Sequence, residues 1–137
     1  MTRLLAASAL LATLIACKTS PNEHDYIPAA EPAGIRGDLT TTFDRNALRV
    51  ELLAVDDSSY IVFARDRVTV APFRVVRKAV FEPIGTTTRD GRGPSSDHRD
   101  QLKYASRFPY GISPAVMERL LQRSGQQRPD NLSAAPQ

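Results

Sequence analysis

The chain's first candidates for chemistry are a histidine and its acidic neighbours. Asp97, His98 and Asp100 supply nitrogen and oxygen atoms of the kind that bind metal ions. They follow one another in a single stretch, and no second cluster of ligands accompanies them. Because zinc sites usually combine ligands from separate elements, we expect no metal here and a solvated loop instead.

The adjacent carboxylates Asp56 and Asp57 are the second arrangement that could do chemistry, as an acid–base pair. Neighbouring residues at a strand end point to opposite sides, so a hairpin turn explains the pair better. The stretch Gly91-Arg92-Gly93-Pro94 is too short for a phosphate-binding loop, and the serines lack a nucleophile-elbow context. The sequence therefore predicts a protein that is not an enzyme and needs no cofactor.

Aromatic and basic side chains alternate in one further segment, which is the candidate binding surface. It consists of Lys103, Tyr104, Arg107, Phe108 and Tyr110. Rings beside cations suit a carbohydrate, a cell-wall polymer or a lipid headgroup. The alternative is that these rings pack the C-terminal helix onto the strands, and the sequence leaves both interpretations open.

Cys17 is the only cysteine of the chain, and it directly follows an apolar run. Arg3 provides a positive start, and residues 4–16 carry no charge. That run is shorter than the roughly 20 residues that a membrane-spanning helix needs. The layout predicts a secretory signal peptide over residues 1–16.

With Ala16 immediately before Cys17, this segment resembles the lipobox signal of bacterial lipoproteins. The resemblance implies cleavage ahead of Cys17, diacylation of its thiol, and a mature chain held stably in a membrane. Lys18, where aspartate would favour the inner membrane, points to the outer membrane of the cell envelope. An ordinary secreted protein with one free thiol is the alternative.

The 137-residue chain is long enough for one domain, and its single cysteine excludes an intramolecular disulfide. Its charge is uneven: residues 18–66 carry 5 basic and 9 acidic side chains, whereas residues 67–137 carry 12 and 6. Such asymmetry suggests a basic face for anionic lipid or a cell-wall polymer, although scattered surface charge would give the same count. Export excludes nucleic acid as a partner.

The order of the predicted elements is a tether followed by a single α+β domain. Residues 17–39 contain prolines and little apolar periodicity, which predicts a flexible tether to the lipid. Residues 40–125 form the domain, and alternation and turn residues over 47–83 predict an antiparallel β-meander. Its expected strands are 47–55, 60–64, 67–72 and 79–81.

The rest of the chain is predicted to hold one long loop and one or two helices. Residues 84–99 are rich in glycine and small polar residues, which is typical of a loop. Residues 100–108 could form a short helix with Leu102, Ala105 and Tyr104 facing inward. Residues 114–123 have helical apolar spacing after Ser113-Pro114, a favourable start. Residues 126–137 are expected to be a disordered tail.

Residues 50–81 resemble small barrels of the Sm-like and SH3-like kind. In that pattern a strand ends in an acidic turn (Asp56-Asp57-Ser58), a tight hairpin follows, and a proline with one helical turn (Pro72 to Val76) leads into the last strand. The resemblance implies a small β-barrel with a C-terminal helix. It implies no function, because such barrels serve many.

These observations predict a lipid-anchored envelope protein with a non-enzymatic interaction or scaffolding role. Its expected partners are the membrane, through Cys17, and an unidentified envelope protein. The alternative is a module that contacts anionic lipid or cell-wall polymer through its basic C-terminal half.

Overall fold

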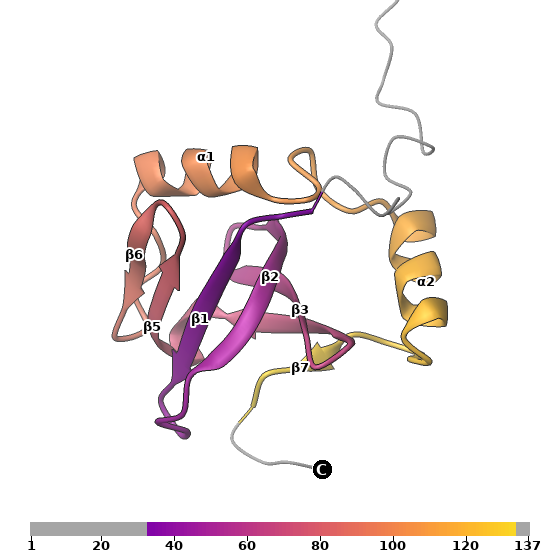
Figure 1. The fold of residues 1–137 in the computed structure, drawn as a ribbon, viewed down its shortest axis with the longest axis horizontal. Coiled ribbons are helices and arrows are strands. Elements are labelled where there is room, and N and C mark those ends of the chain that lie inside the picture. Colours follow the sequence, from indigo (N-terminus) through magenta and orange to yellow (C-terminus); the bar gives the residue numbers. More distant parts are fainter. Residues whose placement is uncertain (1–32, 134–137) are drawn as a thin grey trace, which may run out of the picture.

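The structure is a computed structural model that describes residues 33–133. It contains seven strands, one 3₁₀ turn and two helices (Figure 1). In chain order these are β1 (Arg36–Thr41), β2 (Leu48–Val55), β3 (Ser59–Ala64), β4 (Arg67–Pro72), η2 (Phe73–Val75), β5 (Val76–Phe81), β6 (Gly85–Arg89), α1 (Ser96–Ala105), α2 (Pro114–Arg123) and β7 (Asp130–Asn131).

All seven strands belong to one sheet with the order β6-β5-β1-β2-β3-β4-β7. Strands β2, β3 and β4 are joined by short turns and pair antiparallel, which confirms the predicted meander. The turn between β3 and β4 consists of Arg65 and Asp66, both with positive φ, as a two-residue hairpin turn requires. The α+β class is therefore confirmed.

The domain begins earlier in the chain than predicted. The expected tether reached residue 39, whereas residues 36–41 form β1, which pairs with both β2 and β5. This strand has few apolar residues and depends on pairing with distant segments, so its local sequence gives little sign of it. Cys17 and the predicted signal peptide lie outside the described residues.

The predicted loop 84–99 is only partly a loop. Gly85–Arg89 form β6, which pairs antiparallel with β5, and α1 begins at Ser96. The Ser95 hydroxyl accepts a hydrogen bond from the His98 amide and caps that helix. The helix expected over 100–108 thus starts and ends earlier, at Ala105.

The second helix, α2, has the predicted bounds of 114–123. The Ser113 hydroxyl accepts from the Val116 amide, and Pro114 takes the first helical position. After α2 the chain turns at Gly125 and returns to the sheet, where β7 pairs in parallel with β4. The tail predicted over 126–137 therefore contributes ordered structure up to its described end.

Two apolar clusters hold these elements together, one on each face of the sheet. The first fills the concave side and includes Leu102 of α1. The second lies between the outer face of β2 to β4 and α2. Leu52 and Leu53 are both fully buried because adjacent strand residues point to opposite faces and each face is covered by a cluster. The β2–β3 register shift between Leu52 and Ala54 interrupts this alternation, so that Leu53 and Ala54 both lie in the second cluster.

The predicted small barrel is not confirmed. The sheet curves around the first cluster, but β6 and β7 are its end strands and do not pair with each other in the described part of the chain. The structure therefore shows an open, curved sheet, with α1 near one end and the β1–β2 turn at the other (Figure 1).

Candidate functional site

The connector between α1 and α2 carries the most exposed aromatic side chains of the described domain. Tyr104, in the last turn of α1, is 88% exposed, and Tyr110 is 80% exposed. Both tyrosines line a shallow hollow of about 480 Å³ together with Asp100, Lys103 and Pro109. We call these five residues the tyrosine surface.

Backbone contacts of the connector hold this surface in place. The Ser106 hydroxyl donates to the Lys103 carbonyl at 2.7 Å and ends α1. The Gly111 amide bonds to the Phe108 carbonyl at 3.0 Å, and Gly111 has φ +92, a conformation that glycine adopts without strain. The turn between them directs Tyr110 outward while Phe108, 2% exposed, anchors the connector in the second apolar cluster.

The structure divides the candidate binding surface predicted from sequence into two groups. Lys103, Tyr104 and Tyr110 come together on the tyrosine surface. Phe108 is buried in the second apolar cluster and Arg107 is held against Glu51, so neither joins the tyrosine surface. Tyr104 also does not face inward as expected, because the α1 residue that reaches the core is Leu102.

Arg107 forms a half-buried ion pair that ties three segments together. Its guanidinium donates two hydrogen bonds to Glu51 of β2, at 2.7 and 2.6 Å. Glu51 Oε1 also accepts from the Gly34 amide at 2.8 Å. A bidentate pair of this kind fixes geometry as well as charge, so it holds the connector against β2 and against the start of the domain.

The chain enters the domain beside the tyrosine surface. The Ile35 amide bonds to the carbonyl of Ala105, the residue after Tyr104, at 3.1 Å, and the Leu52 amide bonds to the Ile35 carbonyl. A Cβ on Gly34 would lie 1.8 Å from the Leu52 carbonyl oxygen, so only glycine allows this close approach. Any segment that precedes residue 33 therefore starts next to the α1–α2 connector.

The histidine and carboxylates considered above as candidates for chemistry lie in a helix and in a turn. Asp97 and His98 lie in the first turn of α1, and among residues 33–133 no three His, Cys, Asp or Glu side chains gather as a metal site would require. Burial alone would raise the pKa of Asp56, but hydrogen bonds from the Ser59 hydroxyl and the Ser58 and Ser59 amides outweigh it, so the pKa lies below its usual value. This carboxylate closes the β2–β3 turn.

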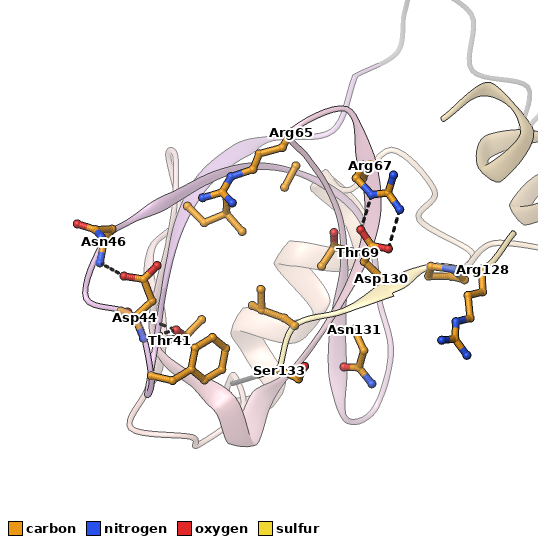
Figure 2. Close-up of a pocket in the computed structure, with 15 residues that line it drawn as sticks. Thr41, Asp44, Asn46, Arg65, Arg67, Thr69, Arg128, Asp130, Asn131 and Ser133 are labelled. Carbon is orange, nitrogen blue, oxygen red and sulfur yellow. Dashed lines mark hydrogen bonds and ion pairs between the residues drawn. The ribbon is translucent and has the colours of Figure 1, made fainter. Parts of the chain in front are cut away.

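A second hollow, not foreseen from sequence, lies at the opposite end of the curved sheet (Figure 2). This end hollow has a volume of about 1020 Å³, with Leu48, Ala64 and Leu132 among its apolar lining residues. At its rim the guanidinium of Arg67 pairs with the carboxylate of Asp130. One side of the hollow is formed by residues 128–133, which sequence reasoning assigned to the tail.

Neither helix of the described domain is long and apolar enough to cross a membrane. Comparison of the chain with protein families, curated proteins and solved structures finds no match.

Proposed function

We propose that this protein is a lipid-anchored, non-enzymatic interaction module of the bacterial cell envelope, and that the tyrosine surface is its contact site for a partner protein. The observation that carries the proposal is the exposure of Tyr104 and Tyr110, 88% and 80%, around one hollow. Tyrosine is enriched among the residues that dominate protein–protein contacts, because its ring buries apolar area at little conformational cost.

The charges of the tyrosine surface favour a protein as the partner. It contains one cation, Lys103, and one carboxylate, Asp100, so it offers no excess charge to a polyanion. The two rings and Pro109 supply apolar area. The tyrosine hydroxyls can form hydrogen bonds across an interface. Binding to this surface should therefore depend little on salt.

The anchor is proposed from the lipobox resemblance at Cys17. The described chain begins at Ala33, beside the α1–α2 connector, which supports an arrangement in which the tether and the tyrosine surface are neighbours. Acylation of Cys17 would confine the domain to within the reach of residues 17–32. Lys18 after the cysteine supports placement in the outer membrane. Confinement of this kind raises the effective concentration of the module toward any partner in the same membrane.

The role of the polar residues supports a non-enzymatic function. Asp56 stabilises a turn, Glu51 and Arg107 pair with each other, and the Ser95 and Ser113 hydroxyls cap helices. None of these groups is left to act on a substrate.

We further propose that β1 to β5 have the arrangement of a small SH3-like barrel that is left open. In support, η2 lies between β4 and β5, where the residue pattern places one helical turn, and β1 pairs with β2 and β5. This arrangement implies no activity, because such folds serve many functions.

The test of the contact site is in-cell photo-crosslinking with p-benzoylphenylalanine in place of Tyr104 or Tyr110. We expect both positions to give the same protein adduct on a denaturing gel. The matched control is the same substitution at Phe43, at the other end of the domain, which should not capture that protein. A result with no protein adduct at 104 or 110, or with the same adduct at all three positions, would overturn the proposed site.

A further inference from the structure

Five exposed cations gather on the hairpin of β5 and β6 and on η2 before it. We call them the basic hairpin: Arg74, Arg77, Lys78, Arg89 and Arg92. Within the described domain none of them forms an ion pair. Lys78 and Arg89 lie directly opposite each other on adjacent strands, a like-charge arrangement that disfavours the fold unless an anion is present.

Backbone hydrogen bonds bring these cations together from two segments of the chain. The Gly91 amide bonds to the Val76 carbonyl at 2.9 Å, and the Asp90 amide to the Arg77 carbonyl at 2.7 Å. Gly91, with φ +77, also lies against the backbone of Arg74. The β1–β5 register shifts between Thr40 and Thr41, which leaves Arg77 as an extra exposed residue. Asp90 is the only acidic residue within this end of the hairpin.

An exposed apolar ring adjoins the basic hairpin. The Thr42 amide bonds to the Val75 carbonyl at 2.9 Å, so the β1–β2 turn is attached to η2. Phe43 follows Thr42 and is 39% exposed; apart from Tyr104 and Tyr110, no other large hydrophobic side chain of the described residues is so open. Cations beside one exposed ring are the composition of a surface that rests on anionic lipid.

The length of the chain before the domain allows this surface to reach the bilayer that would hold the anchor. Strand β1 begins at Arg36, opposite Glu51, close to where the chain enters the domain. The basic hairpin lies at the other end of β1, where Thr41 pairs with Val76. A strand of six residues is about 17 Å long. Sixteen residues separate Cys17 from the start of the described domain, counting Cys17 itself, and a chain of that length would span roughly 22 Å as a coil. This length exceeds that of β1.

We propose that the basic hairpin and Phe43 rest on the anionic surface of the bilayer that carries the anchor, so that the tyrosine surface faces away from it. This inference rests on the proposed acylation of Cys17 and adds an orientation to it. Electrostatic attraction holds the basic end against the headgroups, and the far end of the domain stays accessible to a partner protein.

The test uses the mature acylated protein in vesicles whose phosphatidylglycerol has brominated acyl chains, which quench nearby tryptophan. The chain has no tryptophan, so Phe43→Trp and Tyr110→Trp each introduce a single reporter. We expect the fluorescence of Phe43→Trp to fall by about half or more, and that of Tyr110→Trp to stay unchanged. The quenching should be lost in brominated phosphatidylcholine and at roughly 0.5 M salt. Asn46→Trp, in the same turn as Phe43, is a second reporter should Phe43→Trp not fold.

A charge-matched pair of variants completes the test. Lys78→Gln with Arg89→Gln should abolish the quenching of the Phe43→Trp reporter. Arg36→Gln with Arg123→Gln, which removes the same charge at exposed positions elsewhere, should leave it intact. Equal quenching of both reporters, quenching of Tyr110→Trp alone, or quenching that survives the Lys78 and Arg89 changes would overturn the inference. So would binding of the basic hairpin to isolated cell wall in place of vesicles. Mass spectrometry of the N-terminus before reconstitution separates a failed anchor from a failed orientation.

Discussion

At the residue scale, the α1–α2 connector separates side chains that hold the domain together from side chains that face solvent. Arg107 and Phe108 point into the domain, and Tyr104 and Tyr110 lie almost fully in water. The sequence segment contains both kinds in alternation, and the difference between them arises from contacts with β2 and α2. Stability and partner binding should therefore respond to different substitutions.

The first prediction compares these two groups. Arg107→Ala should lower the free energy of unfolding by about 2 to 4 kcal/mol, because it leaves the half-buried Glu51 carboxylate without its cation. Tyr104→Ser and Tyr110→Ser should each change it by less than about 0.5 kcal/mol. Urea denaturation followed by circular dichroism measures both. Equal losses for Arg107 and the tyrosines would show that the tyrosine surface is part of the fold.

The second prediction concerns acid and Asp56. Its pKa in the folded protein lies below the usual 3.8, because hydrogen bonds from Ser59 and Ser58 outweigh the effect of burial. A carboxylate of lowered pKa stabilises the fold above its unfolded pKa, and this stabilisation is lost as the pH falls through the folded pKa. We expect the urea concentration at which half of the native protein is unfolded to fall as the pH is lowered below about 4. In Asp56→Asn this urea midpoint should fall less over the same pH range. Ser59→Ala, which removes one hydrogen-bond donor to Asp56, should have a pH dependence of stability between those two. If the native protein and Asp56→Asn had the same pH dependence, the lowered pKa of Asp56 would be contradicted.

At the element scale, the parts predicted from sequence are those with local signals. Helix α2 has its cap serine, its first-turn proline and its apolar spacing within a dozen residues, and strands β2 to β4 alternate between turn residues. Strand β1, in contrast, is a polar stretch that becomes a strand because β2 and β5 pair with it. The sequence of strand β6, one glycine, three threonines and an arginine, is also typical of a loop, and it forms a strand by pairing with β5.

The same reason explains which site residues were predicted. Exposed tyrosines beside a lysine could be selected from sequence, whereas the burial of Arg107 depends on Glu51, 56 residues away. The end hollow and the basic hairpin consist of residues from separate segments that strand pairing brings together. No local sequence pattern therefore predicts them.

The third prediction concerns the segment after α2. The Gln126 side chain, 7% exposed, accepts from the Val68 amide at 2.7 Å and donates to the Val68 carbonyl at 3.0 Å, so it completes the edge of β4 as a strand would. Gln126→Ala should lower the free energy of unfolding by about 2 to 3 kcal/mol, because it leaves a buried amide and carbonyl unpaired.

Native-state hydrogen exchange provides the direct readout of that contact. In Gln126→Ala the Val68 amide should exchange faster than in the native protein, ahead of the amides of β3. The neighbouring Gln127→Ala, an exposed position, is the control and should leave exchange at Val68 unchanged. Unaltered protection of Val68 in Gln126→Ala would mean that the side chain does not cap the strand.

At the scale of the whole molecule, the tyrosine surface lies at one end of the described domain, away from the basic hairpin and the end hollow. The chain enters beside the tyrosine surface, and the basic hairpin and the end hollow lie toward the opposite end of the sheet (Figures 1 and 2). This separation would allow one end to rest on lipid, as proposed, while the other contacts a partner protein. The proposed orientation depends on acylation of Cys17, because without an acyl group no bilayer would be held near the domain. The same anchor would confine the proposed partner contact to that membrane.

The measurement that tests the account most directly is therefore mass spectrometry of the N-terminus of the protein purified from membranes, together with fractionation of Cys17→Ser. We predict that the mature chain begins at Cys17, carries the mass of its acyl groups, and is found with the membranes, and that Cys17→Ser is unacylated and released. A native chain without added lipid mass at Cys17, or a Cys17→Ser variant retained in the membrane as firmly as the native protein, would contradict the account.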